Sequence, residues 1–383
     1  MTALAAGGRG SGTSSWPPMK RPTAEGGENG STAIMNYVSS ETAEISTRRD
    51  LGGSDDALIG AIWSPTVVNV GNARLPGNQM SLDGNGFELV TNSKTDEVDL
   101  FHQLDFCNQD EVVGDYYPTC ERIVADAFMS QSSAKSSTRI AHVCAFDHNV
   151  RSSDRASVGK ITSKRDLSVD PDDEKTATAT PQVQNPAGLV HADYTKVSAP
   201  RRLLDLSKEP KLNDVLRPKL GKNPLLDPNI VQEAVEEKRR YAFVNVWRSI
   251  DTENVNNPPL ACVDATTVTV DDLRTFKIHY VDRVGENYFV CCPSPCNSSD
   301  RQHSWYYYPG MTMKEALLLK QWDSMGGMAR GANSDGTSRD CAGAGGGLST
   351  FTIHSAFLDP SRPDKPPRKS IEVRCVVIWE KED

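Results

Sequence analysis

The sequence predicts a mainly β protein with flanking helices, arranged as an antiparallel barrel or jelly roll. Three observations favour this class. Short apolar segments alternate with turn-forming residues, few segments have helical periodicity, and histidines fall on two of the predicted strands. At 383 residues the chain is long enough for one large domain or two ordinary ones. We expect a single domain over residues 56–383.

The N-terminal residues 1–55 differ in composition from the rest of the chain. They are rich in Gly, Ser, Thr, Ala and Glu and have almost no apolar periodicity. Such segments are usually disordered, because they bury too little apolar surface to offset the loss of chain entropy. We therefore expect a disordered tail here. Two other polar stretches, near residues 152–186 and 326–347, predict surface insertions in loops.

Helices are expected where apolar residues recur at helical spacing. These segments are residues 110–130, 228–240 and 312–322, with weaker signals from residue 201 onward that prolines interrupt. Strands are expected where β-branched and aromatic residues form short runs. These runs are residues 87–90, 139–146, 241–247, 261–263, 305–308, 349–357 and 370–379. A hairpin is expected over residues 275–282 and 287–292.

Composition and charge exclude several classes of protein. The 42 basic and 51 acidic residues give a net charge of −9, which disfavours nucleic-acid binding because that requires a basic surface. No apolar run approaches the roughly 20 residues that cross a bilayer, and the first 30 residues lack the apolar core of a signal peptide. These features predict a soluble, cytoplasmic protein with no membrane partner.

The nine cysteines are odd in number and irregularly spaced, so we expect free thiols rather than a disulfide framework. Cys291, Cys292 and Cys296 form one cluster, with His303 nearby. A structural zinc site normally needs a second closely spaced ligand pair, which is missing, so free thiols are favoured here too. The chain also lacks a dinucleotide fingerprint, a P-loop and a GxSxG motif, which excludes the commonest enzyme classes that carry them.

A candidate metal site begins with His191 and Asp193. Residues i and i+2 of a strand point to the same face, so this imidazole and carboxylate can bind one metal ion. His354, near the end of another predicted strand, is the candidate third ligand. Two histidines and one carboxylate with open positions are typical of non-haem Fe(II) oxygenases. The alternative is a set of polar strand ends that bind nothing.

Candidate cosubstrate residues follow downstream. Arg368 and Ser370 share a face of the last predicted strand, and a guanidinium beside a hydroxyl suits the far carboxylate of a dicarboxylate keto acid. Arg374 shares that face and is an alternative clamp. Arg151 is a possible contact of substrate or cosubstrate, with a surface ion pair as the alternative. Arg248 follows an apolar strand that ends in Trp247, so it is a candidate to line the cavity mouth and contact substrate or cosubstrate there.

Several segments together resemble the fungal and bacterial hydroxylase/desaturase family related to the cephamycin 7-alpha-methoxylase component. These segments are residues 146–151, 190–195, 245–248, 305–309, 322–324, 354–357 and 368–374. The resemblance covers about residues 85–380. It implies a double-stranded β-helix, a cupin-like jelly roll, that uses Fe(II), O₂ and usually 2-oxoglutarate in secondary-metabolite biosynthesis. It also implies His191, Asp193 and His354 as the metal ligands, and Arg368 with Ser370 as the 2-oxoglutarate clamp.

The expected reaction is oxidation of an unactivated C–H bond of a small metabolite by hydroxylation, desaturation or oxidative cyclisation. One alternative is a non-haem iron oxidase on the same scaffold that does not use 2-oxoglutarate. Another is a non-catalytic cupin-like binding protein, although such a protein has no need for three ligands and an Arg-x-Ser pair. A zinc hydrolase is a further alternative, but the sequence offers no obvious general base for it.

Overall fold

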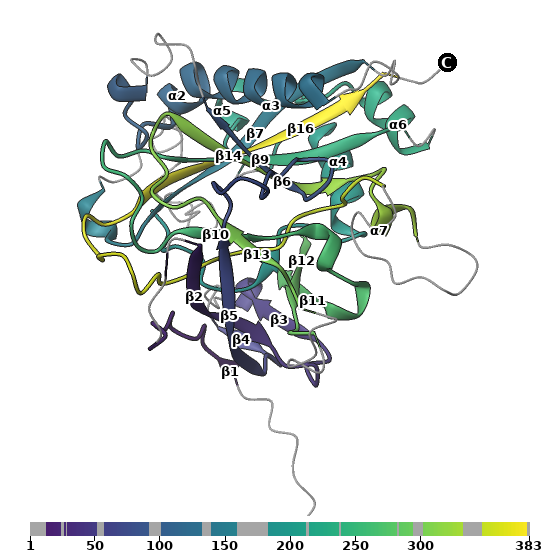
Figure 1. The fold of residues 1–383 in the computed structure, drawn as a ribbon. Helices are drawn as coiled ribbons and strands as arrows, with labels where there is room; N and C mark the ends of the chain where they lie inside the picture. Colours follow the sequence, from purple (N-terminus) through teal and green to yellow (C-terminus); the bar gives the residue numbers. More distant parts are fainter. Residues whose placement is uncertain are drawn as a thin grey trace, which may run out of the picture.

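The computed structural model describes residues 13–23, 27, 29–51, 57–91, 101–131, 139–158, 183–211, 214–236, 239–281, 283–293, 302–331 and 347–380. These residues form two β-sheets, and helices cover the outer face of the smaller sheet (Figure 1). The main apolar core includes side chains from both sheets and from the covering helices. This arrangement confirms the predicted mainly β, jelly-roll class.

The larger sheet has eleven strands in the order β1-β4-β3-β11-β12-β8-β15-β10-β13-β5-β2. Their bounds are Thr13–Ser14 (β1), Gly30–Val38 (β2), Ile45–Arg48 (β3), Leu58–Ile59 (β4), Trp63–Asn72 (β5), His191–Ala192 (β8), Leu260–Val263 (β10), Leu273–His279 (β11), Val284–Val290 (β12), Trp305–Tyr307 (β13) and His354–Ala356 (β15). Strands β11 and β12 pair antiparallel, from Leu273 opposite Val290 to His279 opposite Val284. The predicted hairpin is therefore confirmed.

The smaller sheet has five strands in the order β6-β14-β9-β16-β7, and all neighbours are antiparallel. Their bounds are Phe87–Thr91 (β6), Ile140–Ser152 (β7), Tyr241–Ser249 (β9), Glu315–Asp323 (β14) and Lys369–Trp379 (β16). The three central strands are buried along nearly their whole length. They are covered on one side by helices and on the other by the larger sheet, which explains their apolar runs at residues 241–244, 316–319 and 375–379.

The helical layer begins with the predicted helix near residues 110–130, which is confirmed. It consists of α2 (Gln109–Glu111), a π-helical turn over Val112–Tyr116, and α3 (Tyr117–Gln131). Helix α3 packs on β7, β9 and β16. Further α-helices among the described residues are α4 (Ser198–Leu206), α5 (Arg217–Leu220), α6 (Pro228–Glu236) and α7 (Gly327–Arg330). The 3₁₀ turns are Arg49–Leu51, Arg155–Ser157, Ala265–Thr267 and Val270–Asp272.

The predicted disordered tail over residues 1–55 is wrong for much of its length. Strand β2 pairs with β5 through nine residues, and Ala33, Met35 and Tyr37 are at most 1% exposed. The side chains of Ala33, Met35 and Tyr37 share one face of the strand, and this spacing of apolar residues by two is a strand signal. This strand pattern is short and lies within a segment rich in Gly, Ser and Thr, so the composition of the segment predicted disorder instead. Residues 1–12, 24–26, 28 and 52–55 of this prediction lie outside the described residues.

The helix predicted over residues 312–322 is also wrong, because this segment forms β14 between β6 and β9. A short run of leucines fits a buried strand as well as a helix, and periodicity does not separate the two. In the strand predicted over 349–357, only His354–Ala356 is paired. The insertions predicted near 152–186 and 326–347 fall largely on residues 159–182 and 332–346, which lie outside the described residues. The single-domain boundary stays a prediction.

Candidate metal centre

The two histidines predicted as ligands are direct partners in the larger sheet. His354 on β15 lies opposite His191 on β8, and their ring centroids are 4.4 Å apart. Asp193 follows β8 immediately. One potential ligand atom from each of these three side chains lies within 4.8 Å of the other two. Among the described residues, this is the one cluster of His, Cys, Asp or Glu with such geometry.

The backbone fixes the orientation of His191. Its Nδ1 lies 2.8 Å from the carbonyl oxygen of Leu189, so Nδ1 carries the proton and the Nε2 lone pair faces Asp193. The distance from Nε2 to Asp193 Oδ1 is 3.7 Å. Burial, together with nearby His354, lowers the pKa of His191 to about 4. Burial also lowers the pKa of His354. Both rings are therefore neutral at pH 7, which is the form that binds a metal.

Two features of this cluster fit a metal ion. The buried Nδ1 of His354 has no hydrogen-bond partner among the described residues, which is unfavourable for an imidazole that binds nothing. Burial alone would raise the pKa of Asp193, but Arg374 and the two histidines hold it below its usual range. The cluster thus offers two neutral imidazoles and one carboxylate, a donor set that suits Fe(II).

A cavity surrounds these three side chains. Its other lining residues are Arg151, Ala187, Trp247, Leu260, Ala356, Arg368 and Glu372. The guanidinium of Arg368 is buried, donates to Ser370 Oγ at 3.2 Å and to the carbonyl oxygen of Pro258 at 2.9 Å, and lies 5.2 Å from the Trp247 ring centroid. Burial lowers the pKa of Arg368 to about 9, which leaves it charged at pH 7.

The structure brings two of the predicted arginines to the cavity and leaves two outside it. Arg151 lines the cavity with Arg368, is half-buried, and donates to the carbonyl oxygen of Asn185 at 2.9 Å. Arg248 is fully buried and donates to the Tyr116 hydroxyl at 3.0 Å. Neighbouring strand residues face opposite sides, so Trp247 points into the cavity and Arg248 points toward the helices.

Arg374 is surrounded by acidic and amide groups behind Asp193. It contacts Asp147 Oδ2 at 3.0 Å and Glu372 Oε1 at 3.3 Å, and its Nε lies 3.9 Å from Asp193 Oδ2. The Asn149 amide, turned so that its oxygen faces the guanidinium, accepts from it at 3.0 Å. These contacts occupy the guanidinium, so Arg374 is not placed to serve as a cosubstrate clamp.

Sequence reasoning missed three residues near the ligands. Glu372 lies on the same strand face as Ser370 and Arg374, and the alternation of β16 indicates its position. Asn245 donates to Asp193 Oδ2 at 3.0 Å, and Gln321 accepts from the Asp193 backbone N–H at 3.4 Å. Asn245 interrupts an apolar run of β9, and Gln321 lies among the polar residues that follow the leucine run of β14. A polar residue within or beside an apolar run of a buried strand was the signal that could have identified them.

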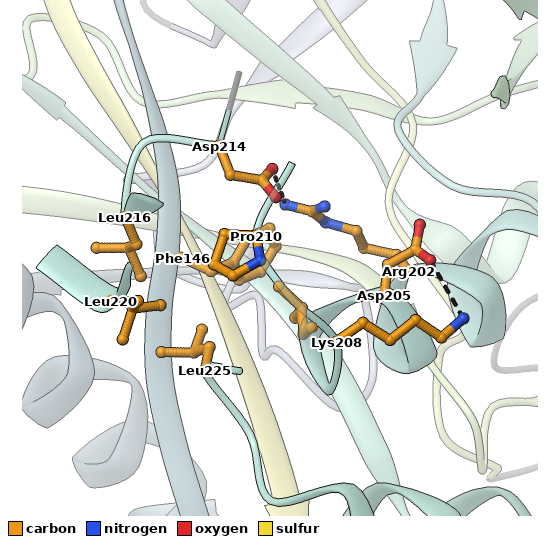
Figure 2. Close-up of a pocket in the computed structure, with 10 residues that line it drawn as sticks. Phe146, Arg202, Asp205, Lys208, Pro210, Asp214, Leu216, Leu220 and Leu225 are labelled. Carbon is orange, nitrogen blue, oxygen red and sulfur yellow. Dashed lines mark hydrogen bonds and ion pairs between the residues drawn. The ribbon is translucent and has the colours of Figure 1, made fainter. Parts of the chain in front are cut away.

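A second pocket lies over Phe146 and shares no residue with the cavity of the metal site (Figure 2). Its apolar wall consists of Leu206, Leu216, Leu220 and Leu225. Its cations are paired locally, with Arg202 at 3.5 Å from Asp214 and Lys208 at 3.7 Å from Asp205. The pocket therefore offers an apolar wall without an uncompensated charge.

Known proteins resemble this chain over most of its length. The protein "Hydroxylase/desaturase efuI" of Hormonema carpetanum is 28% identical over 323 residues, which are 83% of this chain and 85% of that protein. The "Alpha-ketoglutarate-dependent dioxygenase phiK" of a fungal species is 25% identical and covers 82% of this chain and 83% of its own. An uncharacterized protein of Methylophilus leisingeri is 32% identical over 54% of this chain and 82% of its own. The resemblance to hydroxylase/desaturases is thus confirmed.

A solved structure supports the fold. The "iron and alpha-ketoglutarate-dependent endoperoxidase NvfI" superposes with a TM-score of 0.58 at 21% identity, over 92% of this chain and 99% of its own. Within the described residues, no helix combines the length and apolar character that crossing a bilayer requires. The family described as "Oxidoreductase/YMDC permease-like domain" matches residues 28–221 and 224–378. The chain belongs to this oxidoreductase-like family.

Proposed function

We propose that this protein is an Fe(II)/2-oxoglutarate-dependent oxygenase that oxidises an unactivated C–H bond of a small metabolite. The observation that carries the proposal is the convergence of His191, Asp193 and His354 in a cavity that also contains Arg151 and Arg368. Relatives named as hydroxylase/desaturase and as alpha-ketoglutarate-dependent dioxygenase support the same reaction class. Such relatives act on small molecules, and we extend that substrate class to this chain.

The three ligands would hold Fe(II), which when bound supplies the activation of O₂ needed to oxidise a C–H bond. Arg368 would bind the far carboxylate of 2-oxoglutarate, with Ser370 orienting the guanidinium. A buried charge pair of this kind is stronger than one in water, because the local dielectric constant is low. Trp247 and Leu260 would exclude water from the cavity.

The proposal also includes the type of pathway, the cellular compartment and the class of partner. Fungal relatives named for biosynthetic or hydroxylase/desaturase roles support secondary-metabolite biosynthesis. The seven described cysteines are free thiols, which supports a reducing compartment such as the cytoplasm. The net charge of −9 supports a partner other than nucleic acid.

An anaerobic titration of the apoprotein with Fe(II) and then 2-oxoglutarate tests the proposal. The expected result is a weak visible charge-transfer band that requires both additions and is absent in His354→Ala. Arg122→Gln is the matched control, since Arg122 lies on helix α3 in an ion pair with Asp126. Iron binding without the band would favour an oxidase that does not use 2-oxoglutarate. No iron binding would overturn the proposal.

A further inference from the structure

Asp193 is held mainly by side chains rather than by strand pairing. Strand β8 has two residues, and its pairing with β12 and β15 ends before Asp193. Gln321 on β14 accepts from the Asp193 backbone N–H at 3.4 Å. The Asn287 amide on β12, in the orientation that satisfies its contacts, donates to the Asp193 carbonyl oxygen at 2.9 Å. The position of this carboxylate therefore depends on groups from neighbouring strands.

The two oxygens of the Asp193 carboxylate have different contacts. Asn245 Nδ2 on β9 donates to Oδ2 at 3.0 Å, and Arg374 Nε lies 3.9 Å from the same oxygen. Arg374 is in turn fixed by Asp147 and Glu372. The other oxygen, Oδ1, faces His191 Nε2 at 3.7 Å. One oxygen is thus occupied by protein donors, and the other is directed toward the ligand cluster.

Two of the three amides that contact Asp193, those of Asn245 and Gln321, are costly to bury. Asn245 and Gln321 are both 0% exposed. Asn245 Oδ1 and Gln321 Nε2 have no hydrogen-bond partner among the residues that the structure describes. A buried amide with one unpaired end is less favourable than an apolar side chain of similar size. Stability of the core does not account for these residues, whereas their shared contact with Asp193 does.

We propose that Asn245 and Arg374 are positioning residues that hold Asp193 Oδ2, so that the metal is bound through Oδ1 alone. The inference rests on the proposed function, because it concerns the same metal centre. Two imidazoles and a single carboxylate oxygen leave three positions of an octahedral ion open. A carboxylate that turned to bind through both oxygens would take one of the positions that cosubstrate and O₂ require.

The test compares Asn245→Leu with the wild-type protein by Co(II) titration of the apoprotein and by thermal unfolding. Leucine has a similar size and removes both the contact to Asp193 and the unpaired amide oxygen. We expect an unchanged or higher melting temperature, Co(II) affinity that is lower by about 10- to 100-fold, and an altered visible Co(II) spectrum. A residue that acted only on stability would change the melting temperature and leave the spectrum unchanged.

Val246→Ala is the matched control, since Val246 is the next residue on β9, is fully buried, and faces the opposite side. It should lower the melting temperature and leave Co(II) affinity unchanged. Asn245→Ser serves if leucine prevents folding, and Arg374→Lys should weaken Co(II) binding in the same direction. Wild-type affinity and spectrum in the folded Asn245 variants would overturn this inference alone. Absence of Co(II) binding by the wild-type protein would overturn the proposed function as well.

Discussion

The imidazole rings of His191 and His354 lie 4.4 Å apart because the two residues are direct partners between antiparallel strands β8 and β15. Asp193 reaches the same point from the end of β8, so three potential ligands meet where two short strands pair. The residues come from chain positions that are far apart, and the pairing of β8 with β15 is what brings them together. Metal binding is therefore expected to stabilise this part of the fold.

The first prediction concerns that stabilisation. Saturating Co(II) or Fe(II) should raise the melting temperature, since a ligand at 100 times its Kd contributes about 2.7 kcal/mol to the native state. In His354→Ala the rise should be absent, because one of the two imidazoles is missing. Differential scanning fluorimetry with and without metal measures this. A full metal-dependent rise in His354→Ala would show that the metal binds elsewhere.

The second prediction separates metal binding from cosubstrate binding. Arg368→Gln should leave Fe(II) affinity unchanged and weaken 2-oxoglutarate binding by about 10- to 100-fold, the loss of one charge-assisted hydrogen-bonding group. Arg151→Gln should have a smaller effect, because Arg151 is half-buried and more accessible to water. Calorimetric titration of the iron-loaded proteins with 2-oxoglutarate measures both. Equal affinities in Arg368→Gln and the wild-type protein would contradict the clamp.

The third prediction concerns a buried ion-pair network on the helix side of the smaller sheet. Asp323 and Lys320 are both 0% exposed and lie 3.0 Å apart, and Arg240 contacts Asp323 at 2.7 Å. Asp83 contacts the same two cations, Lys320 at 2.7 Å and Arg240 at 2.8 Å. Asp323→Asn should lower the free energy of unfolding by about 1.5–3 kcal/mol, because it removes charged hydrogen bonds and leaves Asp83 as the carboxylate that faces both cations. Asp126→Asn, in an exposed pair with Arg122, should change it by less than about 1 kcal/mol.

The same network predicts how stability depends on pH. Burial alone would raise the pKa of Asp323, but Lys320 and Arg240 hold the pKa below its usual range. A carboxyl group whose pKa is lower in the folded state contributes stability above its unfolded pKa. That contribution is lost as the pH falls through the folded value. Urea unfolding from pH 6 to pH 3 should thus show a decline in the wild-type protein that is smaller in Asp323→Asn.

Local patterns identified the three candidate ligands, which the structure brings together, but not the side chains that contact Asp193. His191 and Asp193 follow from strand alternation, and His354 follows from its place in an apolar strand. The contact of Asn245 with Asp193 depends on how the smaller sheet packs against the larger one, and no local pattern encodes that packing. The same reason explains the wrong prediction for β14. Its leucine run is compatible with a helix or a strand, and its pairing with β6 and β9, which no local pattern shows, makes it a strand.

The last prediction tests whether β2 is an integral part of the fold. Met35 is 0% exposed on β2, whereas Val67 on the paired strand β5, opposite Ile34, is 64% exposed. Met35→Ala should lower the free energy of unfolding by about 2–5 kcal/mol, because it removes buried apolar contacts and leaves a cavity. Val67→Ala should change it by less than about 0.5 kcal/mol. Urea titration followed by tryptophan fluorescence measures both values. A negligible effect of Met35→Ala would indicate that the segment is attached loosely, as its composition suggests. A large effect would establish that residues with tail-like composition complete the larger sheet.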